Sequence, residues 1–268
     1  MTRNYNKENS MLNTKKIFKC ASIALLLMVG GLQAKTINEE FTVASGGLLK
    51  IATDVGAIDI ETHAKETVLV EVEISGENED DMNISFKNSG DNVSIKGDFE
   101  RSSLGNNHIR VTYKVTLPET YNIDLDTSGG SIEVENLKGK VDAYTSGGSI
   151  SLEDMQGDID IKTSGGSLEL ENIIGKINAK TSGGSIKLTL PTNPSKDSKL
   201  KTSGGSITAY LAKDVAVNIT AKTSGGRVSS EFTVKGKTTK RSIEGTINGG
   251  GPELVLKTSG GNVRIKEI

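Results

Sequence analysis

A six-residue string, TSGGSI, recurs along the second half of the chain and constrains the fold more than any other feature. The string or a close variant begins at seven threonines: Thr127, Thr145, Thr163, Thr181, Thr202, Thr223 and Thr258. The first three intervals are 18 residues and the next two are 21 residues. Such a short period is typical of a solenoid, in which one small unit stacks on the next.

Within each repeat, apolar and polar residues alternate on both sides of the glycines, which predicts two strands with one buried face. In the repeat at Thr145 we expect Val141, Ala143, Ile150 and Leu152 to point inward and Glu153 outward. Equivalent positions predict two columns of core residues: Ile123, Val141, Ile159, Ile177, Ile219 and Leu254, then Ile132, Ile150, Leu168, Ile186, Ile207, Val228 and Val263. The predicted fold class is all-β, a single-stranded right-handed parallel β-helix with coils of about 18 to 21 residues.

Two bends per coil are needed, and the sequence offers one candidate for each. We expect the Gly-Gly pairs to form the first bend, because glycine tolerates positive φ and lets backbones approach closely. These predicted structural turns are Gly129, Gly130, Gly147, Gly148, Gly165, Gly166, Gly183, Gly184, Gly204, Gly205, Gly225, Gly226, Gly260 and Gly261. The second bend is expected at 135–139 (ENLKG) and 153–157 (EDMQG).

Residues 35–126 lack the literal string but keep its rhythm, so we interpret them as degenerate coils continuous with the regular repeat of 127–268. Leu49 and Ile51 would precede one bend, and Ile84 and Phe86 another. The segments 99–108, 191–198 and 235–253 break the pattern, which predicts loops or a small hairpin outside the coil.

Residues 1–34 have the pattern of a secretory signal peptide. Lys15, Lys16 and Lys19 precede the apolar run 21–31, and cleavage would follow Ala34. Translation beginning at Met11 would fit equally well. The run is shorter than a bilayer-spanning helix, and Cys20, the only cysteine, would be removed. We therefore expect an exported protein of the periplasm or cell surface, without a stable membrane span or a disulfide.

The repeats resemble the DUF4097 family, bacterial β-strand-repeat proteins named as adhesins, with a related "head GIN" group. The resemblance covers most of 38–268. It rests on IRVTYKVTLPETYNIDLDTSGGSIEVENLKGKVDAYTSGGSI at 109–150 and on GGGPELVLKTSGGNVRI at 249–265. It implies a right-handed β-helix with an adhesin-like role, and it brings no catalytic or binding residues.

Composition argues against two classes of function. The first 34 residues hold five of the 32 basic and one of the 34 acidic residues, so the remainder has 27 basic and 33 acidic residues, which appear interspersed. We therefore do not expect a nucleic-acid partner. An enzyme is also not expected, because His63 and His108 are the only histidines and tryptophan is absent. No catalytic residue and no cofactor are predicted.

Three columns of polar residues remain as candidates for a site. Equivalent outward positions are taken by Glu135, Glu153 and Glu171. One interpretation is a calcium site in which the ion bridges the three carboxylates, and the simpler one is an acidic stripe leaning toward Lys138, Lys140 or Lys176. A serine column would either form turn hydrogen bonds or order water: Ser128, Ser146, Ser164, Ser182, Ser203 and Ser224. The threonines of the repeat fall on the inward side, where we expect them to satisfy backbone groups.

Taken together, the sequence predicts an exported, non-enzymatic solenoid that acts as an adhesin or cell-envelope interaction protein through many weak, repeated contacts. The partner would be a glycan or protein of the envelope or surface. A structural spacer and a polysaccharide-active enzyme are the alternatives.

Overall fold

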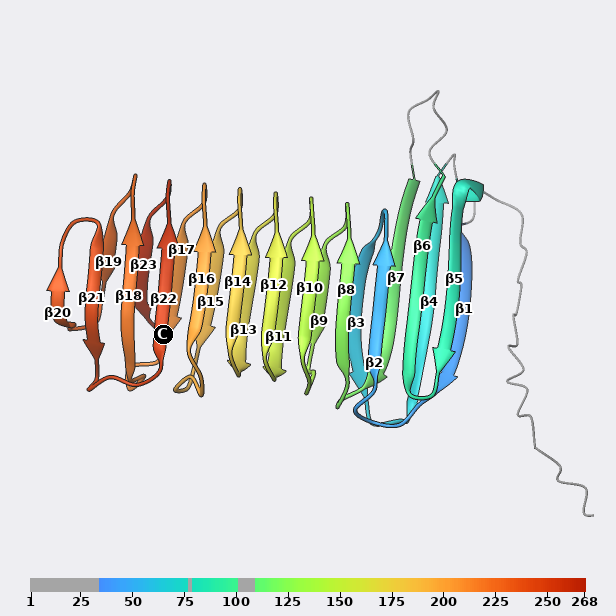
Figure 1. The fold of residues 1–268 in the computed structure, drawn as a ribbon, viewed down its shortest axis with the longest axis horizontal. Helices are drawn as coiled ribbons and strands as arrows, with labels where there is room; N and C mark the ends of the chain where they lie inside the picture. The colour runs from blue at the N-terminus through green and yellow to red at the C-terminus, as the bar shows by residue number, and fades with distance from the viewer. Residues whose placement is uncertain (1–33, 77–78, 101–108) are drawn as a thin grey trace, which may run out of the picture.

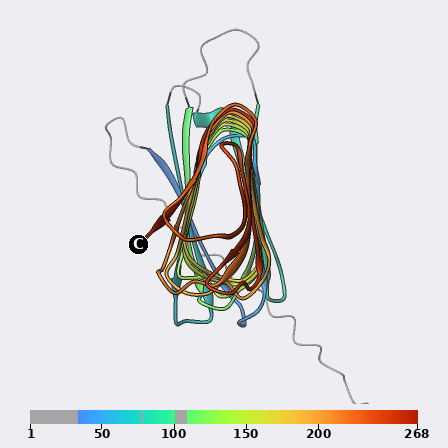
Figure 2. The ribbon, with the colours of Figure 1, turned by 90° about the vertical axis from the view of Figure 1, so that its left-hand side faces the viewer.

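The computed structural model describes residues 34–76, 79–100 and 109–268, so the predicted signal peptide and His108 lie outside the described residues. Twenty-three strands form two facing sheets, one of 11 and one of 12 strands. Figure 1 shows the strands side by side along the long axis, and Figure 2, turned by 90°, shows the chain as a flattened coil seen end-on. The predicted all-β parallel solenoid is confirmed.

Five regular coils form the middle of the molecule, and each contributes one strand to each sheet. Their strands are β8 (Asn122–Thr127), β9 (Ile132–Glu135), β10 (Val141–Thr145), β11 (Ile150–Gln156), β12 (Ile159–Thr163), β13 (Leu168–Ile174), β14 (Ile177–Thr181), β15 (Ile186–Leu190), β16 (Ser198–Thr202) and β17 (Ile207–Leu211). Neighbouring coils pair in parallel and in register, so that Thr145 lies opposite both Thr127 and Thr163. The repeat in sequence thus becomes a repeat in space.

The core is a set of apolar columns between the two sheets. All residues of the two predicted columns are buried, and Ile150 and Leu152 have no exposed surface. Leu137, Met155 and Ile173 fill the core at the second bend. The inward and outward assignment of the regular repeats is therefore confirmed.

At the C-terminal end the coils do not follow the order of the sequence. The strands are β18 (Val217–Thr223), β19 (Val228–Ser230), β20 (Lys235–Thr238), β21 (Ser242–Ile247), β22 (Glu253–Thr258) and β23 (Val263–Glu267). The last coil, β22–β23, inserts between β16–β17 and β18–β19. Figure 1 shows β22 between β16 and β18. The small hairpin expected in 235–253 is confirmed as β20 and β21. It does not leave the coil, however, because β21 extends the 12-stranded sheet antiparallel to β18.

The N-terminal end also departs from sequence order. The strands are β1 (Lys35–Thr42), β2 (Leu48–Thr53), β3 (Ala57–His63), β4 (Thr67–Gly76), β5 (Met82–Ser89), β6 (Asn92–Phe99) and β7 (Ile109–Pro118), with a short 3-10 turn at Glu79–Asp81. The coil β2–β3 pairs in parallel with β8–β9 on one side and with β6 and β7 on the other. Both sheets run without a break from these strands into the regular repeat.

One part of the predicted N-terminal rhythm is wrong. Ile84 and Phe86 do not belong to a coil of their own, because β5 folds back on β6 as an antiparallel hairpin within one sheet. On the other sheet, β4 and β1 also add antiparallel strands. These strands cover the end of the parallel stack, where unpaired edges would otherwise invite association.

No helix in the described part of the chain is long and apolar enough to cross a lipid bilayer.

Candidate functional site

The threonines at the first bend join each coil to its neighbour. Thr145 Oγ1 donates a hydrogen bond to the carbonyl oxygen of Gly130 at 2.8 Å and accepts one from Gly148 N at 3.2 Å. The same pair of bonds is made by Thr163 with Gly148 and Gly166. These buried hydroxyls therefore satisfy backbone groups, as the sequence predicts.

The glycine pairs lie at this bend, but the reason for glycine differs from the expectation. None of the fourteen corner glycines has a positive φ in the left-handed region. A Cβ atom on Gly148 would instead lie 2.1 Å from the carbonyl oxygen of Gly130, whereas one on Gly147 would have no neighbour closer than 3.8 Å. Close approach of backbones explains the second glycine of the pair, and steric contact does not explain the first at this coil.

The turn hydrogen bonds expected of the first serine column belong to a different set of serines. Ser149 N donates to Ser131 Oγ at 3.3 Å, and Ser167 N donates to Ser149 Oγ at 3.1 Å. The residue after each glycine pair thus forms the ladder between coils. The serines that precede the glycines are exposed on the surface, as Ser146 and Ser164 illustrate.

The second bend uses left-handed backbone at residues that tolerate it. Asn136, Asp154 and Asn172 have φ values of 58°, 54° and 51°. Asparagine and aspartate adopt this region more readily than other residues with a Cβ atom. In these three coils the two bends are therefore built by different chemistry.

The three glutamates of the candidate calcium site do lie side by side. Glu153 is in register with Glu135 on one side and with Glu171 on the other. Burial raises the pKa of Glu153 above its usual value, and repulsion from Glu171 and Glu135 raises it further. In the described residues, no group of three or more histidine, cysteine or acidic side chains is arranged to hold a metal ion.

The lysines named as partners for this acidic row have other contacts. Lys138 pairs with Glu119 at 3.1 Å and Lys140 with Asp142 at 2.5 Å. The interpretation that the row leans toward these lysines is therefore wrong for these two. Lys187 pairs with Glu169 at 2.6 Å, a glutamate of a different column, and the row itself ends beside Thr189.

The most prominent polar feature is a row of five lysines on the 12-stranded sheet, which we call the lysine ladder. Its members each precede the threonine of a TSGG turn: Lys162, Lys180, Lys201, Lys222 and Lys257. Strand pairing places them in the spatial order 162, 180, 201, 257, 222. Because β22 is inserted between β16 and β18, Lys257 lies between Lys201 and Lys222.

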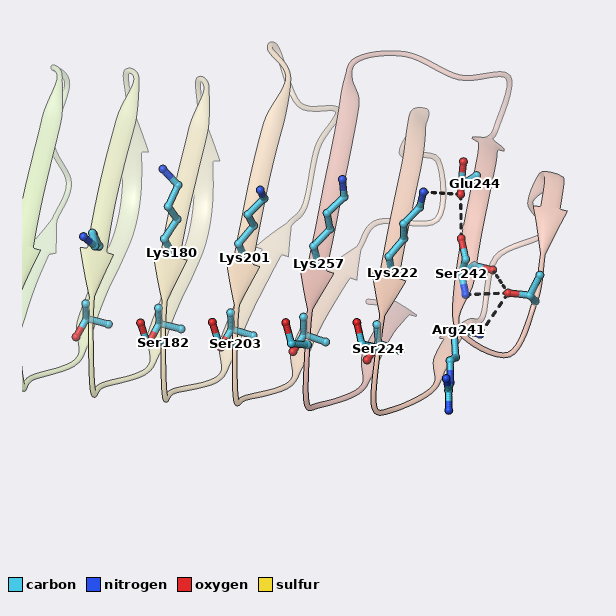
Figure 3. Close-up of a pocket in the computed structure, with 18 of the residues that line it drawn as sticks. Lys180, Ser182, Lys201, Ser203, Lys222, Ser224, Arg241, Ser242, Glu244 and Lys257 are labelled. Carbon is cyan, nitrogen blue, oxygen red and sulfur yellow. Dashed lines mark hydrogen bonds and ion pairs between the residues drawn. The ribbon is translucent and has the colours of Figure 1, made fainter.

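The ladder lines a groove together with side chains of the first bend and the capping hairpin. Lys237, Arg241 and Glu244 close the groove at the C-terminal end, and serines of the bend border it along one side. Figure 3 shows Lys180, Lys201, Lys257 and Lys222 in a row, with Ser182, Ser203 and Ser224 nearer the bend. With neighbouring strands about 4.8 Å apart, five lysines extend over about 19 Å.

Most of the ladder lacks opposite charge. Lys222 forms an ion pair with Glu244 at 2.7 Å, and Lys162 lies 5.5 Å from the ring centroid of Tyr144. Among the described residues, no carboxylate pairs with Lys180, Lys201 or Lys257. Their positive potential is therefore directed into the groove.

Repulsion within this region is visible in one pKa. The ammonium group of Lys199 lowers the pKa of Lys201 below its usual value, and burial together with Lys257 and Lys180 lowers it further. Like charges in register repel one another. A bound anion would relieve this repulsion.

Sequence reasoning missed the ladder although its signal is present. The five copies of KTSGG carry it, but charges of both signs appear mixed when the chain is scanned linearly. The lysines stand out only when equivalent positions of the stacked coils are compared. In the two earlier coils the same position is occupied by Asp126 and Tyr144. The row is a concentrated basic face in a chain with a formal net charge of −2.

The histidine and carboxylate arrangement of a hydrolase is not assembled around His63. Its Nε2 lies 2.7 Å from the backbone carbonyl oxygen of Thr67, and burial in the β3–β4 bend is partial. Every buried side-chain nitrogen or oxygen in the described residues has a hydrogen-bond partner.

The family model described as Toastrack DUF4097 matches residues 119–266. Because this match covers more than half of the chain, the protein belongs to the DUF4097 family. The match begins later than the resemblance inferred from the sequence and covers the regular coils, the crossover and the lysine ladder.

Solved structures match the chain at low sequence identity and low TM-score. A "putative cell adhesion protein" from Clostridium sporogenes has 18% identity and a TM-score of 0.43, covering 87% of this chain and 100% of its own. A "putative adhesin" from Parabacteroides distasonis has 14% identity and a TM-score of 0.38, covering 88% of this chain and 98% of its own. A "putative lipid binding protein" from the same organism has 14% identity and a TM-score of 0.36, covering 88% of this chain and 97% of its own. No curated protein matches the sequence. These likenesses carry no argument about function.

Proposed function

We propose that the protein is an exported, non-enzymatic binding protein of the cell envelope, of adhesin type, that uses residues 35–268 as one continuous rigid domain. The lysine ladder carries this proposal. Five equivalent charges, fixed in register on a flat sheet, can contact a repeating partner at several points at once. Each contact alone would be weak, since exposed charges are well hydrated and screened by salt.

The glycine pairs act in this proposal as structural turns, and no catalytic, metal or cofactor role is assigned to any residue. The arrangement at the groove supports binding over catalysis, because lysine, serine and threonine line it with Arg241 and a single carboxylate, Glu244. A general acid and a general base held near each other, as hydrolysis of a glycan requires, are not part of that lining.

The test is binding of the purified chain to isolated envelope fractions. We expect binding that weakens as salt is raised and that falls in the triple variant Lys180→Gln, Lys201→Gln, Lys257→Gln. The control removes the same charge elsewhere, at exposed lysines outside the ladder, with Lys65→Gln, Lys87→Gln and Lys213→Gln. Equal loss in the two triple variants would leave only a general charge effect and would refute the role of the ladder.

Two further readouts separate the alternatives. A structural spacer predicts envelope binding that does not depend on the lysines. An enzyme predicts release of soluble product when the chain is incubated with polysaccharides. Export is tested separately, by cell fractionation and by the mass change expected from cleavage after Ala34.

A further inference from the structure

The chemistry of the lysine ladder narrows the class of partner. We propose that it binds a linear anionic polysaccharide with carboxylates on regularly spaced sugar residues, laid along the solenoid axis. This inference rests on the proposed function and names the partner of the same site. It follows from the direction of the ladder, from the type of cation and from the neighbouring hydroxyl groups.

The direction of the ladder favours a polymer over a small anion. The lysines succeed one another across strands, so the row runs along the solenoid axis, as Figure 3 shows for four of them. A small anion would contact one or two ammonium groups, whereas a chain parallel to the axis contacts all five. A polymer with one charge per sugar ring has a charge spacing similar to the distance between strands.

The inserted last coil adds a lysine to the middle of this part of the row. Lys257 lies in register with Lys201 on one side and with Lys222 on the other. The out-of-order strand therefore supplies the central contact of the C-terminal half of the groove.

The type of cation favours many separate contacts. Lysine offers a compact ammonium group that meets an anion as a point charge, whereas arginine offers a planar fork suited to bidentate contact with carboxylate or phosphate. Arg241 is the only arginine in the lining. The groove is therefore suited to a row of single anionic groups, such as one carboxylate on each sugar ring.

The hydroxyl groups and the scarcity of aromatic rings distinguish a sugar polymer from a nucleic acid. Serines of the bend run parallel to the lysines, and they can hydrogen-bond to sugar hydroxyls: Ser182, Ser203, Ser224 and Ser259. Single-stranded nucleic acids are usually held by bases stacked on aromatic rings. Tyr144, the aromatic residue in register with the ladder, lies beyond its end and already faces Lys162.

The experiment measures binding of the purified full chain to polygalacturonate by titration calorimetry at several salt concentrations. We expect saturable binding that weakens with salt, and affinity for the galacturonate monomer at least a hundredfold lower. The triple variant at Lys180, Lys201 and Lys257 should lose at least tenfold in affinity, while the control triple variant at Lys65, Lys87 and Lys213 should stay within about twofold.

Three outcomes would overturn the inference: no binding of polygalacturonate, equal loss in the two triple variants, or tighter binding of single-stranded DNA of matched charge than of polygalacturonate. Neutral dextran controls for sugar binding without charge, and equal affinity for it would also overturn the inference. Circular dichroism establishes that each variant is folded. If polygalacturonate fails but the ladder variant still loses envelope binding, the proposed function survives and only the partner class is wrong.

A matched pair of single substitutions tests the contribution of the inserted coil. Lys257→Gln removes an unpaired charge from the row and should reduce affinity more than Lys222→Gln, because Lys222 is already paired with Glu244. The reverse order would contradict binding along a continuous ladder.

Discussion

The two glycines of one TSGG turn should respond very differently to the same substitution. In Gly148→Ala the added Cβ atom would lie 2.1 Å from the carbonyl oxygen and 2.3 Å from the carbonyl carbon of Gly130 in the preceding coil. In Gly147→Ala the nearest heavy atom is the carbonyl oxygen of Ser128 at 3.8 Å, which is ordinary contact. Neither glycine has a positive φ, so the pair differs mainly in space.

The expected cost at Gly148 can be estimated from its contacts. Relief of the clash requires the two coils to separate locally by about 1 Å, and overpacking of this kind costs about 1 to 3 kcal/mol. The shift would also strain two hydrogen bonds of Thr145, to Gly130 O and from Gly148 N, each worth about 1 kcal/mol. We expect Gly148→Ala to lose about 3 to 5 kcal/mol in the free energy of unfolding.

At Gly147 we expect alanine to leave the free energy of unfolding unchanged or to raise it. Alanine restricts the unfolded chain more than glycine and can add about 0.4 to 1 kcal/mol where the native backbone accepts it. Thermal unfolding followed by circular dichroism measures both variants. For a domain of this size, Gly148→Ala should lower Tm by about 10 °C, with little change for Gly147→Ala. Similar shifts in the two variants would refute the steric explanation of the second glycine.

Three further predictions concern the core, the bend and pH. Thr163→Val should lower the free energy of unfolding, measured in urea, by about 1 to 3 kcal/mol, because Gly148 O and Gly166 N lose their hydrogen-bond partner. Ser164→Ala, at an exposed position, should change it by less than about 0.5 kcal/mol. Equal effects would contradict the roles assigned to the two hydroxyls. Ile150→Asp should cost several kcal/mol by burying an unpaired charge (~4 kcal/mol or more). Glu153→Gln should leave stability at pH 7 unchanged or slightly higher, since burial and then the neighbouring carboxylates raise the pKa of Glu153. Comparable melting of both variants would contradict the inward and outward assignment. Burial raises the pKa of Tyr113 to about 12, above the value of about 10 in the unfolded chain. The stability contributed by the neutral phenol is therefore complete below about pH 10 and is lost as pH rises toward about 12. Tyr113→Phe should flatten this alkaline loss of stability, and an unchanged slope would contradict the prediction.

The regular coils could be predicted from the sequence because their pattern is local. Period-two alternation sets which face of each strand is buried, and the fixed interval between threonines sets the register, as the pairing of Thr145 with Thr127 and Thr163 shows. The role of the buried threonines follows from the same parity. These features need no knowledge of which coil lies beside which.

The order of the coils could not be predicted, because every coil presents an equivalent edge. The threonine and second glycine of one coil fit the bend of any other, so Thr258 pairs equally well with Thr202 and Thr223. The choice depends on the long connection through β20 and β21, whose antiparallel pairing with β18 has no counterpart in the repeat. The same applies to the β5–β6 hairpin, where a turn at Gly90 resembles the bend between sheets.

The lysine ladder was missed for a related reason. The charge of a solenoid face depends on summing equivalent positions over stacked coils, and the linear sequence mixes that column with its oppositely charged neighbours. A second outward column lies two residues before the lysine ladder in each coil. It runs from acidic to basic along the solenoid, in the order Asp142, Asp160, Asn178 and Lys199. Reading the repeat as columns separates the acidic early coils from the basic later ones.

The placement of the last coil is tested most directly by disulfide formation in a Cys20→Ser background. Lys201 and Lys257 are paired across neighbouring strands, at a spacing of about 4.8 Å that a disulfide can bridge. Lys201 and Lys222 are two strands apart, at about 9.6 Å. The structure predicts that Lys201→Cys with Lys257→Cys forms an intramolecular disulfide under mild oxidation and that Lys201→Cys with Lys222→Cys does not. The opposite result would show that the coils stack in sequence order, with Lys222 in place of Lys257 beside Lys201.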